Sequence, residues 1–426
     1  MSTETVGTNS SDPLESELES LKENVDAVFL LTNATFVCLI SCLAYWLIGY
    51  AIAYGDGNSF MGLTFWAGVQ IPRIRFSHWF FQFVFAATAA TLVSGAAAER
   101  CNFVAYLVYS AVISGFIYPT VAHWAWAPKG WLLTLGYSDF AGSGPVHMLG
   151  GVCSAVAAYF LGPRIGRFEG EEMPGHSVPL IGIGGMILIT GFLAFNGGSL
   201  GTMTTPGAGA EISIVCANTV MAGAGGALMG LIFFRLGVVK PRCWNFSMTL
   251  NAAFSGMVCV CASADSVKLW GALVMGITGG LVYFGLHFLI IHCKIDDPLD
   301  ATSVHFGGGL WGVLAGPIFK TNGILYGPNK ENLMVFVFNL IGAAAIFTWS
   351  LGTATLMFGL LKYFGLLRVT AEEEIRGLDV TKHNEPAYPK EGWPQNTNRY
   401  KVDGNCIKTC RPKADYTNEI FQMEHM

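Results

Sequence analysis

Residues 178–200 read VPLIGIGGMILITGFLAFNGGSL and carry no charged side chain. About 20 apolar residues form a helix long enough to cross the hydrocarbon core of a bilayer, so this stretch predicts a transmembrane helix. Similar apolar stretches lie on both sides of it. Together they predict ten spans, at about residues 27–54, 76–98, 102–126, 141–162, 178–200, 211–235, 246–264, 267–292, 301–319 and 334–364.

The charged residues are concentrated at the two ends of the chain. Only 12% of the 426 residues are charged, against about 25% in average soluble domains. Residues 1–26 hold eight of them and residues 365–426 hold nineteen. The region between cannot form a water-facing surface, which argues against a secreted domain or a cytosolic enzyme. The net charge of −5, without a long basic run, argues against a nucleic-acid partner.

By composition the chain divides into three parts. Residues 1–26 form a polar acidic N-terminal segment, residues 27–364 a membrane domain, and residues 365–426 a polar tail. The Lys and Arg residues between the spans are mildly biased toward the side of the tail, which favours a cytoplasmic C-terminus. Since no basic segment precedes the first apolar run, we expect no cleavable signal peptide.

Glycine is frequent inside the predicted spans. The chain has 52 glycines, and two runs of small residues lie at residues 182–185 and 223–227. Lipid provides no hydrophobic drive between helices, so small residues at helix contacts allow the backbones to approach closely. We therefore interpret these runs as sites of tight helix packing.

Two histidines lie in matching sequence patterns. His147 and His305 each occur as V-H-x-x-G-G, and each follows an aspartate at a predicted span entrance, in 139–151 (DFAGSGPVHMLGG) and in 296–309 (DDPLDATSVHFGGG). The two copies lie about five spans apart, which predicts a bundle built from pseudo-two-fold inverted repeats. In transporters such repeats place the binding site at their interface, near the middle of the membrane.

Two buried imidazoles can serve a small polar substrate. A neutral imidazole donates at one nitrogen and accepts at the other, so two facing rings could share a proton and line a narrow path. The alternative is that each histidine bonds to a neighbouring helix. A metal site needs more ligands at fixed spacing, and His287 and His292, five residues apart, diverge around a helix. We predict neither a metal nor another cofactor.

Aromatic residues give a second indication. Phe85 lies in the middle of one predicted span, Trp126 ends the next, and Phe195 lies in the span quoted above. Aromatic faces attract cations within about 6 Å of the ring. The alternative is ordinary packing, lipid contact or, for the tryptophan, the interfacial belt.

At these residues the sequence resembles the ammonium transporter (Amt/Mep/Rh) family. The segment 139–151, followed by Leu161-Gly162, is similar to the Amt form of the family signature. The resemblance extends over roughly residues 40–388 and includes 95–100, 195–199, 251–257, 296–309, 367–369 and 377–380.

The resemblance implies a plasma-membrane homotrimer with one pore per subunit for ammonium or ammonia. By position, His147 and His305 match the twin pore histidines of the family, and Phe85 and Phe195 match its phenylalanine gate. The same resemblance implies a substrate-recruitment site that consists of Trp126, Ser199, Phe85 and Asp139. In that site the aspartate either orients backbone or assists recruitment.

The tail also matches the family. Residues 377–383, with Gly377 at their start, resemble a regulatory segment that contacts a neighbouring subunit, and Thr381 lies where plant relatives carry a phosphorylatable threonine. A phosphate there adds about two negative charges and could release the segment, which implies a kinase or another regulatory partner. The alternative is a solvated threonine.

One departure from the family concerns the first spans. The family usually has eleven spans. Here residues 24–33 resemble the start of its first span, and residues 38–47 already resemble its second. We expect the end of one span, a loop and the start of the next to be missing, which gives ten spans and places both termini in the cytoplasm.

Three other functions compete with ammonium transport. The chain could be an ammonium sensor (a transceptor) that signals through its tail. It could be an Rh-like channel for ammonia or CO2, which the Amt form of the signature disfavours. A membrane metalloenzyme is the third, and we predict that the chain is not an enzyme.

Overall fold

The computed structural model describes residues 39–170, 173, 177–238, 242–382, 400–403 and 406–409. The chain divides into two compact units, Met1–Arg368 and Val369–Met426. This division lies four residues beyond the boundary expected from composition. The roles assigned to residues 1–26, 27–364 and 365–426 stay predictions.

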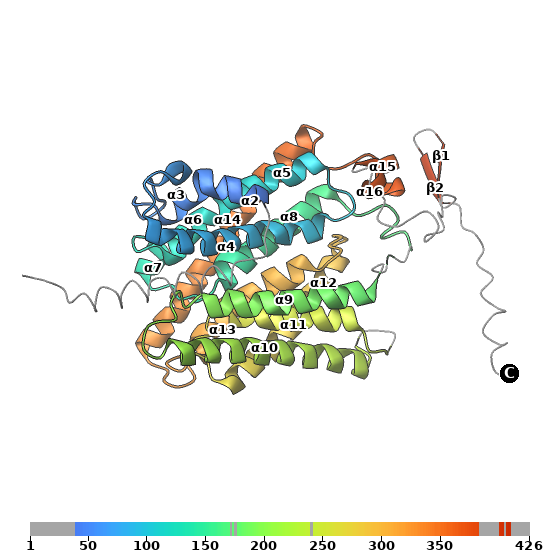
Figure 1. Cartoon of the computed structure of the whole chain (residues 1–426). Coiled ribbons are helices and arrows are strands. Elements are labelled where there is room, and N and C mark those ends of the chain that lie inside the picture. Colours follow the sequence, from blue (N-terminus) through green and yellow to red (C-terminus); the bar gives the residue numbers. More distant parts are fainter. Residues whose placement is uncertain are drawn as a thin grey trace, which may run out of the picture. The chain divides into compact units, whose positions relative to one another are not determined.

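The first unit is helical throughout its described elements (Figure 1). In chain order these are α2 (Leu39–Ala44), η1 (Tyr45–Gly49), α3 (Tyr50–Tyr54), η2 (Trp66–Gly68), η3 (Arg73–Arg75), α4 (Phe76–Ala97), α5 (Phe103–Val112), η4 (Ile113–Ile117), α6 (Tyr118–Trp126), α7 (Trp131–Leu135), η5 (Ser143–Met148), α8 (Leu149–Leu161), α9 (Val178–Gly198), α10 (Ala208–Leu236), α11 (Phe246–Val260), α12 (Leu269–His292), η6 (Thr302–Gly307), α13 (Gly308–Phe319) and α14 (Lys330–Tyr363).

The second unit contains α15 (Ala371–Arg376), α16 (Leu378–Thr381) and the antiparallel strands β1 (Tyr400–Asp403) and β2 (Cys406–Thr409). A capping box begins α15. The Thr370 side chain accepts from the Glu373 backbone N–H, and the Glu373 carboxylate accepts from the Thr370 N–H.

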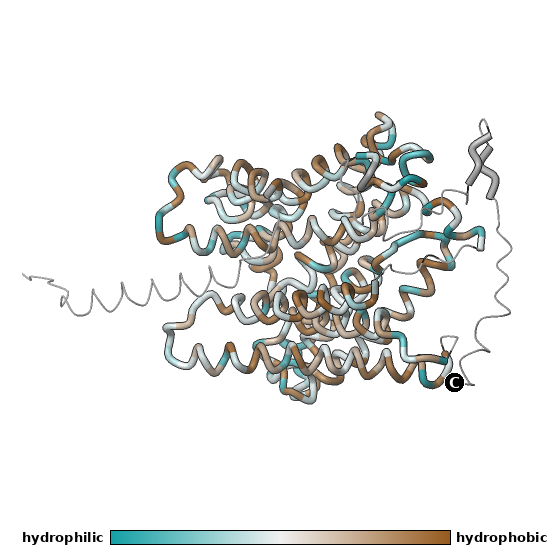
Figure 2. The backbone as a smooth tube through the Cα atoms, turned by 45° about the vertical axis from the view of Figure 1, so that its right-hand side comes forward, coloured by the Kyte–Doolittle hydropathy of each residue, from teal (hydrophilic) through white to brown (hydrophobic). Residues whose placement is uncertain are grey.

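Seven helices among the described residues are long and apolar enough to cross a membrane: Arg73–Ala97, Phe103–Leu135, Ser143–Leu161, Val178–Gly198, Ala208–Leu236, Leu269–His292 and Lys330–Tyr363. Shorter apolar helices occupy Ile40–Tyr54 and Phe246–Val260. Hydrophobic residues run along these helices in Figure 2. The predicted all-α polytopic bundle is confirmed. Of the first predicted span, residues 27–38 lie outside the described residues.

Glycine allows α10, α11 and α12 to pack backbone to backbone. A Cβ atom on Gly226 would lie 2.1 Å from the Ala252 carbonyl oxygen, and one on Gly276 would lie 2.0 Å from the Ala222 carbonyl oxygen. The interpretation of residues 223–227 as a packing site is therefore confirmed. For the run at 182–185 the interpretation holds at Gly185, which packs against Leu250. It does not hold at Gly184, where a Cβ would meet nothing within 4 Å.

A buried ion network ties together the ends of α4 and α8 and the loop between α12 and η6. The Arg164 guanidinium donates to both carboxylate oxygens of Asp296, at 2.8 and 3.1 Å. Arg100, which is fully buried, donates to the backbone carbonyls of Gly162, Ala98 and Asp296. Hydrogen bonds of this kind make a buried charge tolerable.

Candidate functional site

Both histidines of the repeated pattern lie in π-helical turns, His147 in η5 and His305 in η6. An aspartate eight residues earlier accepts backbone N–H groups at the start of each turn. Asp139 Oδ1 accepts from Gly142 (2.7 Å) and Ser143 (3.1 Å). Asp297 accepts from the first residues of the second turn, Ala301 (3.2 Å) and Thr302 (2.7 Å). The same capping geometry therefore presents both imidazoles.

The second glycine of each V-H-x-x-G-G pattern brings the two copies into contact. A Cβ on Gly151 would lie 2.1 Å from the backbone nitrogen of Phe306. In return, a Cβ on Gly309 would lie 2.7 Å from the backbone nitrogen of Met148. Since Met148 and Phe306 follow the two histidines directly, the contact is reciprocal, as the predicted pseudo-two-fold repeat requires.

The two imidazole rings lie parallel to each other. Their centroids are 5.2 Å apart and their planes differ by 12°. Among the described residues, three ring nitrogens have no hydrogen-bond partner: both nitrogens of His147 and the Nδ1 of His305. No hydrogen bond joins the two rings among the described residues, and the sharing of a proton between them stays a prediction. Buried polar atoms without partners are costly and rare, so these nitrogens are suited to a substrate.

Aromatic rings continue this stack toward one end of the bundle. Phe195 on α9 lies 5.4 Å from His147 and is stacked on Phe85 of α4, with centroids 4.0 Å apart and planes 12° apart. Phe85 in turn meets Trp126, the last residue of α6, edge-on at 6.0 Å. Five helical elements, α6, α4, α9, η5 and η6, thus contribute to one continuous line from Trp126 to His305.

The other two predicted recruitment residues lie beside this line. The Asp139 backbone carbonyl accepts from the Trp126 indole N–H at 2.8 Å. The Asp139 carboxylate accepts four hydrogen bonds, three from backbone and one from the Tyr137 hydroxyl. Its geometry therefore suits the orientation of backbone. The Ser199 hydroxyl donates to the Phe195 carbonyl at 2.8 Å, and no hydrogen bond in the described part of the chain joins it to Trp126.

Two further aromatic residues reach the site and were not expected from the sequence. Phe192 stacks against the His147 ring with centroids 5.6 Å apart, and Phe254 on α11 lies 6.1 Å from Phe192. The spacing of three residues between Phe192 and Phe195 places both on one face of α9, and this was the available signal. Phe254 is one phenylalanine among 30 and carries no such signal.

The predicted regulatory residues belong to the second unit. Gly377 has φ of +90°, and its carbonyl accepts from the Thr381 hydroxyl at 2.8 Å. Lys382 pairs with Glu373 at 2.6 Å across the same unit. The relation of Thr381 and Gly377 to the pore residues stays a prediction.

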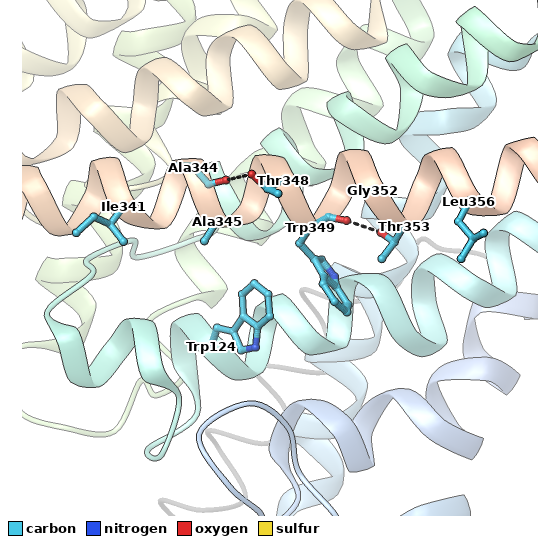
Figure 3. Close-up of a pocket in the computed structure, with 9 residues that line it drawn as sticks. All are labelled: Trp124, Ile341, Ala344, Ala345, Thr348, Trp349, Gly352, Thr353 and Leu356. Carbon is cyan, nitrogen blue, oxygen red and sulfur yellow. Dashed lines mark hydrogen bonds between the residues drawn. The ribbon is translucent and has the colours of Figure 1, made fainter.

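An open groove of about 710 Å³ lies away from the line of rings (Figure 3). One face of α14 forms most of it, and Trp124 of α6 closes the other side. The indole and hydroxyl groups of the residues that line it form hydrogen bonds within the protein. Trp124 donates to the Phe60 carbonyl and Trp349 to the Ile117 carbonyl. The groove is thus apolar, and none of the predicted site residues lines it.

Known proteins match the chain over most of its length. A model of the Ammonium Transporter Family matches residues 12–388. The putative ammonium transporter 1 of Caenorhabditis elegans is 39% identical over 459 aligned positions, which cover 91% of this chain and 84% of the relative. The ammonium transporter Amt2 of Archaeoglobus fulgidus is 37% identical, with coverage of 87% and 82%.

A solved structure gives the same result. A sensor Amt protein superposes with a TM-score of 0.77 at 31% identity, covering 85% of this chain and 99% of that chain. The first alignment above has more positions, 459, than this chain has residues, 426. The worm relative therefore carries additional residues within the aligned region, while the absence of part of the first spans here stays a prediction. The fold, the repeated histidine pattern and these matches together show that the chain belongs to the ammonium transporter family, whose members are membrane transporters of ammonium.

Proposed function

We propose that this chain binds ammonium at Trp126, deprotonates it at the Phe85–Phe195 stack and conducts ammonia past His147 and His305. The observation that carries the proposal is the position of His147. Its two ring nitrogens are buried and have no hydrogen-bond partner among the described residues, and its ring lies at the end of an aromatic line that begins at Trp126.

The aromatic end selects the cation. Trp126 and Phe85 present ring faces and edges within 6.0 Å of each other, and aromatic faces stabilise cations that lose part of their hydration shell. The Ser199 oxygen keeps a lone pair for an N–H donor, since its hydroxyl hydrogen is directed to the Phe195 carbonyl. Potassium has no N–H groups and gains nothing from that acceptor, so its dehydration is less well compensated.

The Phe85–Phe195 stack separates the cation from the interior. Rings with centroids 4.0 Å apart are in van der Waals contact and leave no passage between them. Passage therefore requires a side-chain rotation, which is fast on the scale of transport. Beyond the rings the environment is apolar, and a bare cation there is expensive. An N–H bond of ammonium thus breaks at the stack, the proton passes to water on the Trp126 side, and neutral ammonia proceeds.

The parallel imidazoles then replace part of the water that ammonia loses. Each neutral ring offers one donor and one acceptor, and ammonia can use both. Because neither ring needs to be charged, the path avoids the cost of an ion in the middle of the membrane.

The test is methylammonium uptake by cells without their own ammonium transporters. His147→Ala removes the buried nitrogens, and we expect uptake to fall to the background of empty cells. His292→Ala, which changes an exposed histidine at the end of α12, is the matched control and should transport normally. Normal uptake by His147→Ala would refute the proposed path. The same assay with the missing first-span segment inserted tests whether the short form is fully active.

We further propose a plasma-membrane homotrimer with a cytoplasmic tail whose transport is reduced by phosphorylation at Thr381. The hydroxyl of this residue is engaged with the Gly377 carbonyl, so a phosphate would break an existing contact and add charge beside Glu373 and its neighbours. Thr381→Asp should lower uptake and Thr381→Ser should not. Equal uptake by both variants would contradict a regulatory role.

An ammonium sensor is the second candidate, because the chain is similar to a solved sensor Amt protein. A sensor without transport activity would not restore the growth of cells that lack ammonium uptake. Growth of such cells on limiting ammonium therefore distinguishes the two functions.

A further inference from the structure

The two repeats carry different residues at one equivalent position where both backbones adopt a positive φ. Three residues after each capping aspartate the chain adopts a positive φ, +99° at Gly142 and +57° at Asp300. Glycine takes this conformation without strain, whereas an aspartate accepts it at some cost. In the first repeat the position is filled by glycine, under the Trp126 ring. Strain of this kind is typical of functional positions, so the Asp300 carboxylate calls for an explanation.

The Asp300 carboxylate is held by side chains from two other helices. On α12, His287 Nδ1 lies 2.7 Å from Asp300 Oδ1, and the Tyr283 hydroxyl donates to Oδ2 at 2.8 Å. On α11, Asn251 Nδ2 donates to Oδ2 at 3.3 Å. A carboxylate only accepts, so the hydrogen on Nδ1 points to it and Nε2 is the nitrogen that exchanges a proton.

This cluster lies directly before the second pore histidine. The Asp300 carbonyl accepts from the Val304 N–H at 2.9 Å, one residue before His305. The turn that carries His305 packs on α12, where a Cβ on Gly307 would lie 2.7 Å from Leu286, the neighbour of His287. The His287 and Asp300 side chains are 15% and 17% exposed, so the protein does not enclose them completely.

We propose that the His287–Asp300 pair is the site where ammonia leaving His305 regains a proton. In this step the N–H bond at Nε2 of the His287 imidazolium breaks and a new N–H bond forms on ammonia, which gives ammonium and a neutral imidazole. Asp300 stabilises the positive charge before and after the transfer, and hydronium from the adjoining solvent recharges the imidazole. The inference rests on the proposed conduction of neutral ammonia.

The surroundings suit this role. The ionisable groups that face the pair are Asp297 on the same loop and Tyr283 on α12, while α11 contributes the uncharged Asn251. Both carboxylates favour a positive charge at the site, either on the imidazole or on ammonium. The pair has no counterpart in the first repeat, because a glycine occupies the position of Asp300.

The test uses the full chain in proteoliposomes with an entrapped pH dye. After an ammonium pulse, protonation of ammonia inside the vesicle consumes protons and raises the internal pH. General acids commonly accelerate proton transfer by 10²–10⁴, and water can partly replace the general acid here. We therefore expect Asp300→Asn and His287→Ala each to slow the rise of internal pH at least about tenfold. The double variant should be no slower than either single one, because the two residues act as a unit.

Chemical rescue separates proton donation from a structural role. Imidazole inside the vesicle should restore much of the rate of His287→Ala, whereas phosphate of equal buffering capacity should not. Asp300→Gly, which suits the positive φ and removes the carboxylate, should fold well and remain slow. His292→Gln is the matched control and should behave as the unchanged protein.

The outcomes are distinguishable. Normal rates in Asp300→Asn and His287→Ala, with His147→Ala inactive, would overturn this inference and leave the proposed path intact. Slow variants that imidazole does not restore would assign the pair a structural role and also overturn it. Transport by His147→Ala would refute the proposed path and this inference with it.

Discussion

Asp139 and Asp297 cap the turns that carry the two pore histidines, each from a position eight residues earlier in the chain. The Asp139 carboxylate accepts more of these hydrogen bonds than the Asp297 carboxylate, because it accepts from three backbone N–H groups and from the Tyr137 hydroxyl. With every favourable direction occupied, Asp139 holds the backbone beside Trp126, and this is the contribution to ammonium binding that we propose for it.

The first prediction concerns this carboxylate. Asp139→Ala leaves three buried N–H groups unpaired, at about 1–3 kcal/mol each, so we expect at least about 3 kcal/mol of destabilisation and no methylammonium uptake. Asp139→Asn keeps one acceptor oxygen and should be less destabilised. Thermal unfolding in detergent and uptake in cells measure both effects. An alanine variant with unchanged melting temperature and uptake would contradict the role described here.

The second prediction concerns the gate. Phe195→Ala removes one ring of the stack with Phe85, which should admit water and reduce the discrimination between ammonium and potassium. Currents recorded with each cation in turn measure the selectivity. Phe192→Ala is the comparison, because that ring contacts His147 and not Phe85. We expect it to change the transport rate and to keep potassium excluded. Equal selectivity in both variants would argue against a gate at Phe195.

The third prediction concerns the contact between the repeats. A methyl group at Gly309 would lie 2.4 Å from the Ser143 carbonyl oxygen. Because the obstacle is backbone, no rotamer change relieves it, and overpacking of this kind commonly costs about 1–3 kcal/mol. Gly309→Ala should therefore lower both the melting temperature and uptake. Gly184→Ala is the control, since its methyl group would meet nothing within 4 Å. A stable, active Gly309→Ala protein would show that the helices can separate.

The fourth prediction concerns acid stability. Burial raises the pKa of Asp296, but the hydrogen bonds from Arg164 outweigh it, so the pKa lies below the ordinary value of 3.8. A lowered carboxyl pKa stabilises the fold above the unfolded value, and this contribution is lost as the pH falls through the folded value. The melting temperature should therefore drop below about pH 4.

Asp296→Asn tests that assignment. Its melting temperature should be lower than that of the unchanged protein at pH 7, and the difference should shrink as the solution is acidified toward pH 3. Glu99→Gln changes an exposed partner of the same Arg164, at 65% exposure, and should have little effect. Parallel pH curves for Asp296→Asn and the unchanged protein would rule out the proposed contribution.

The helical bundle and the pairing of the two histidines could be predicted from the sequence for physical reasons, whereas the predicted count of ten spans compares with seven long and two shorter apolar helices among the described residues. Long apolar stretches have few structures available in a membrane, and the repeated V-H-x-x-G-G pattern marks both halves. The contacts between helices were harder to predict from the sequence. The 4.0 Å stack of Phe85 on Phe195 depends on how closely α4 and α9 approach, and neither residue differs in sequence from other buried phenylalanines.

The site details that escaped prediction share a cause. The spacing of His287 and His292 gave no sign of a partner for His287, yet folding brings Asp300 to 2.7 Å from it. Ser199 was grouped with Trp126, but its hydroxyl turns back to its own helix. Both results depend on side-chain direction, which a sequence pattern does not specify. That direction follows from backbone conformations such as the positive φ at Asp300.

The glycine at position 142 and the aspartate at position 300 also bear on direction of flow. Around His147 and His305 the two halves make reciprocal contacts, so the parallel imidazoles of the proposed path favour neither entry nor exit. At the ends the halves have diverged. When the ammonium concentration is equal on both sides, the two fluxes cancel. Under a gradient, the aromatic end and the acidic end of the proposed path bind and release ammonium at different rates. The proposed path would then behave as a rectifier.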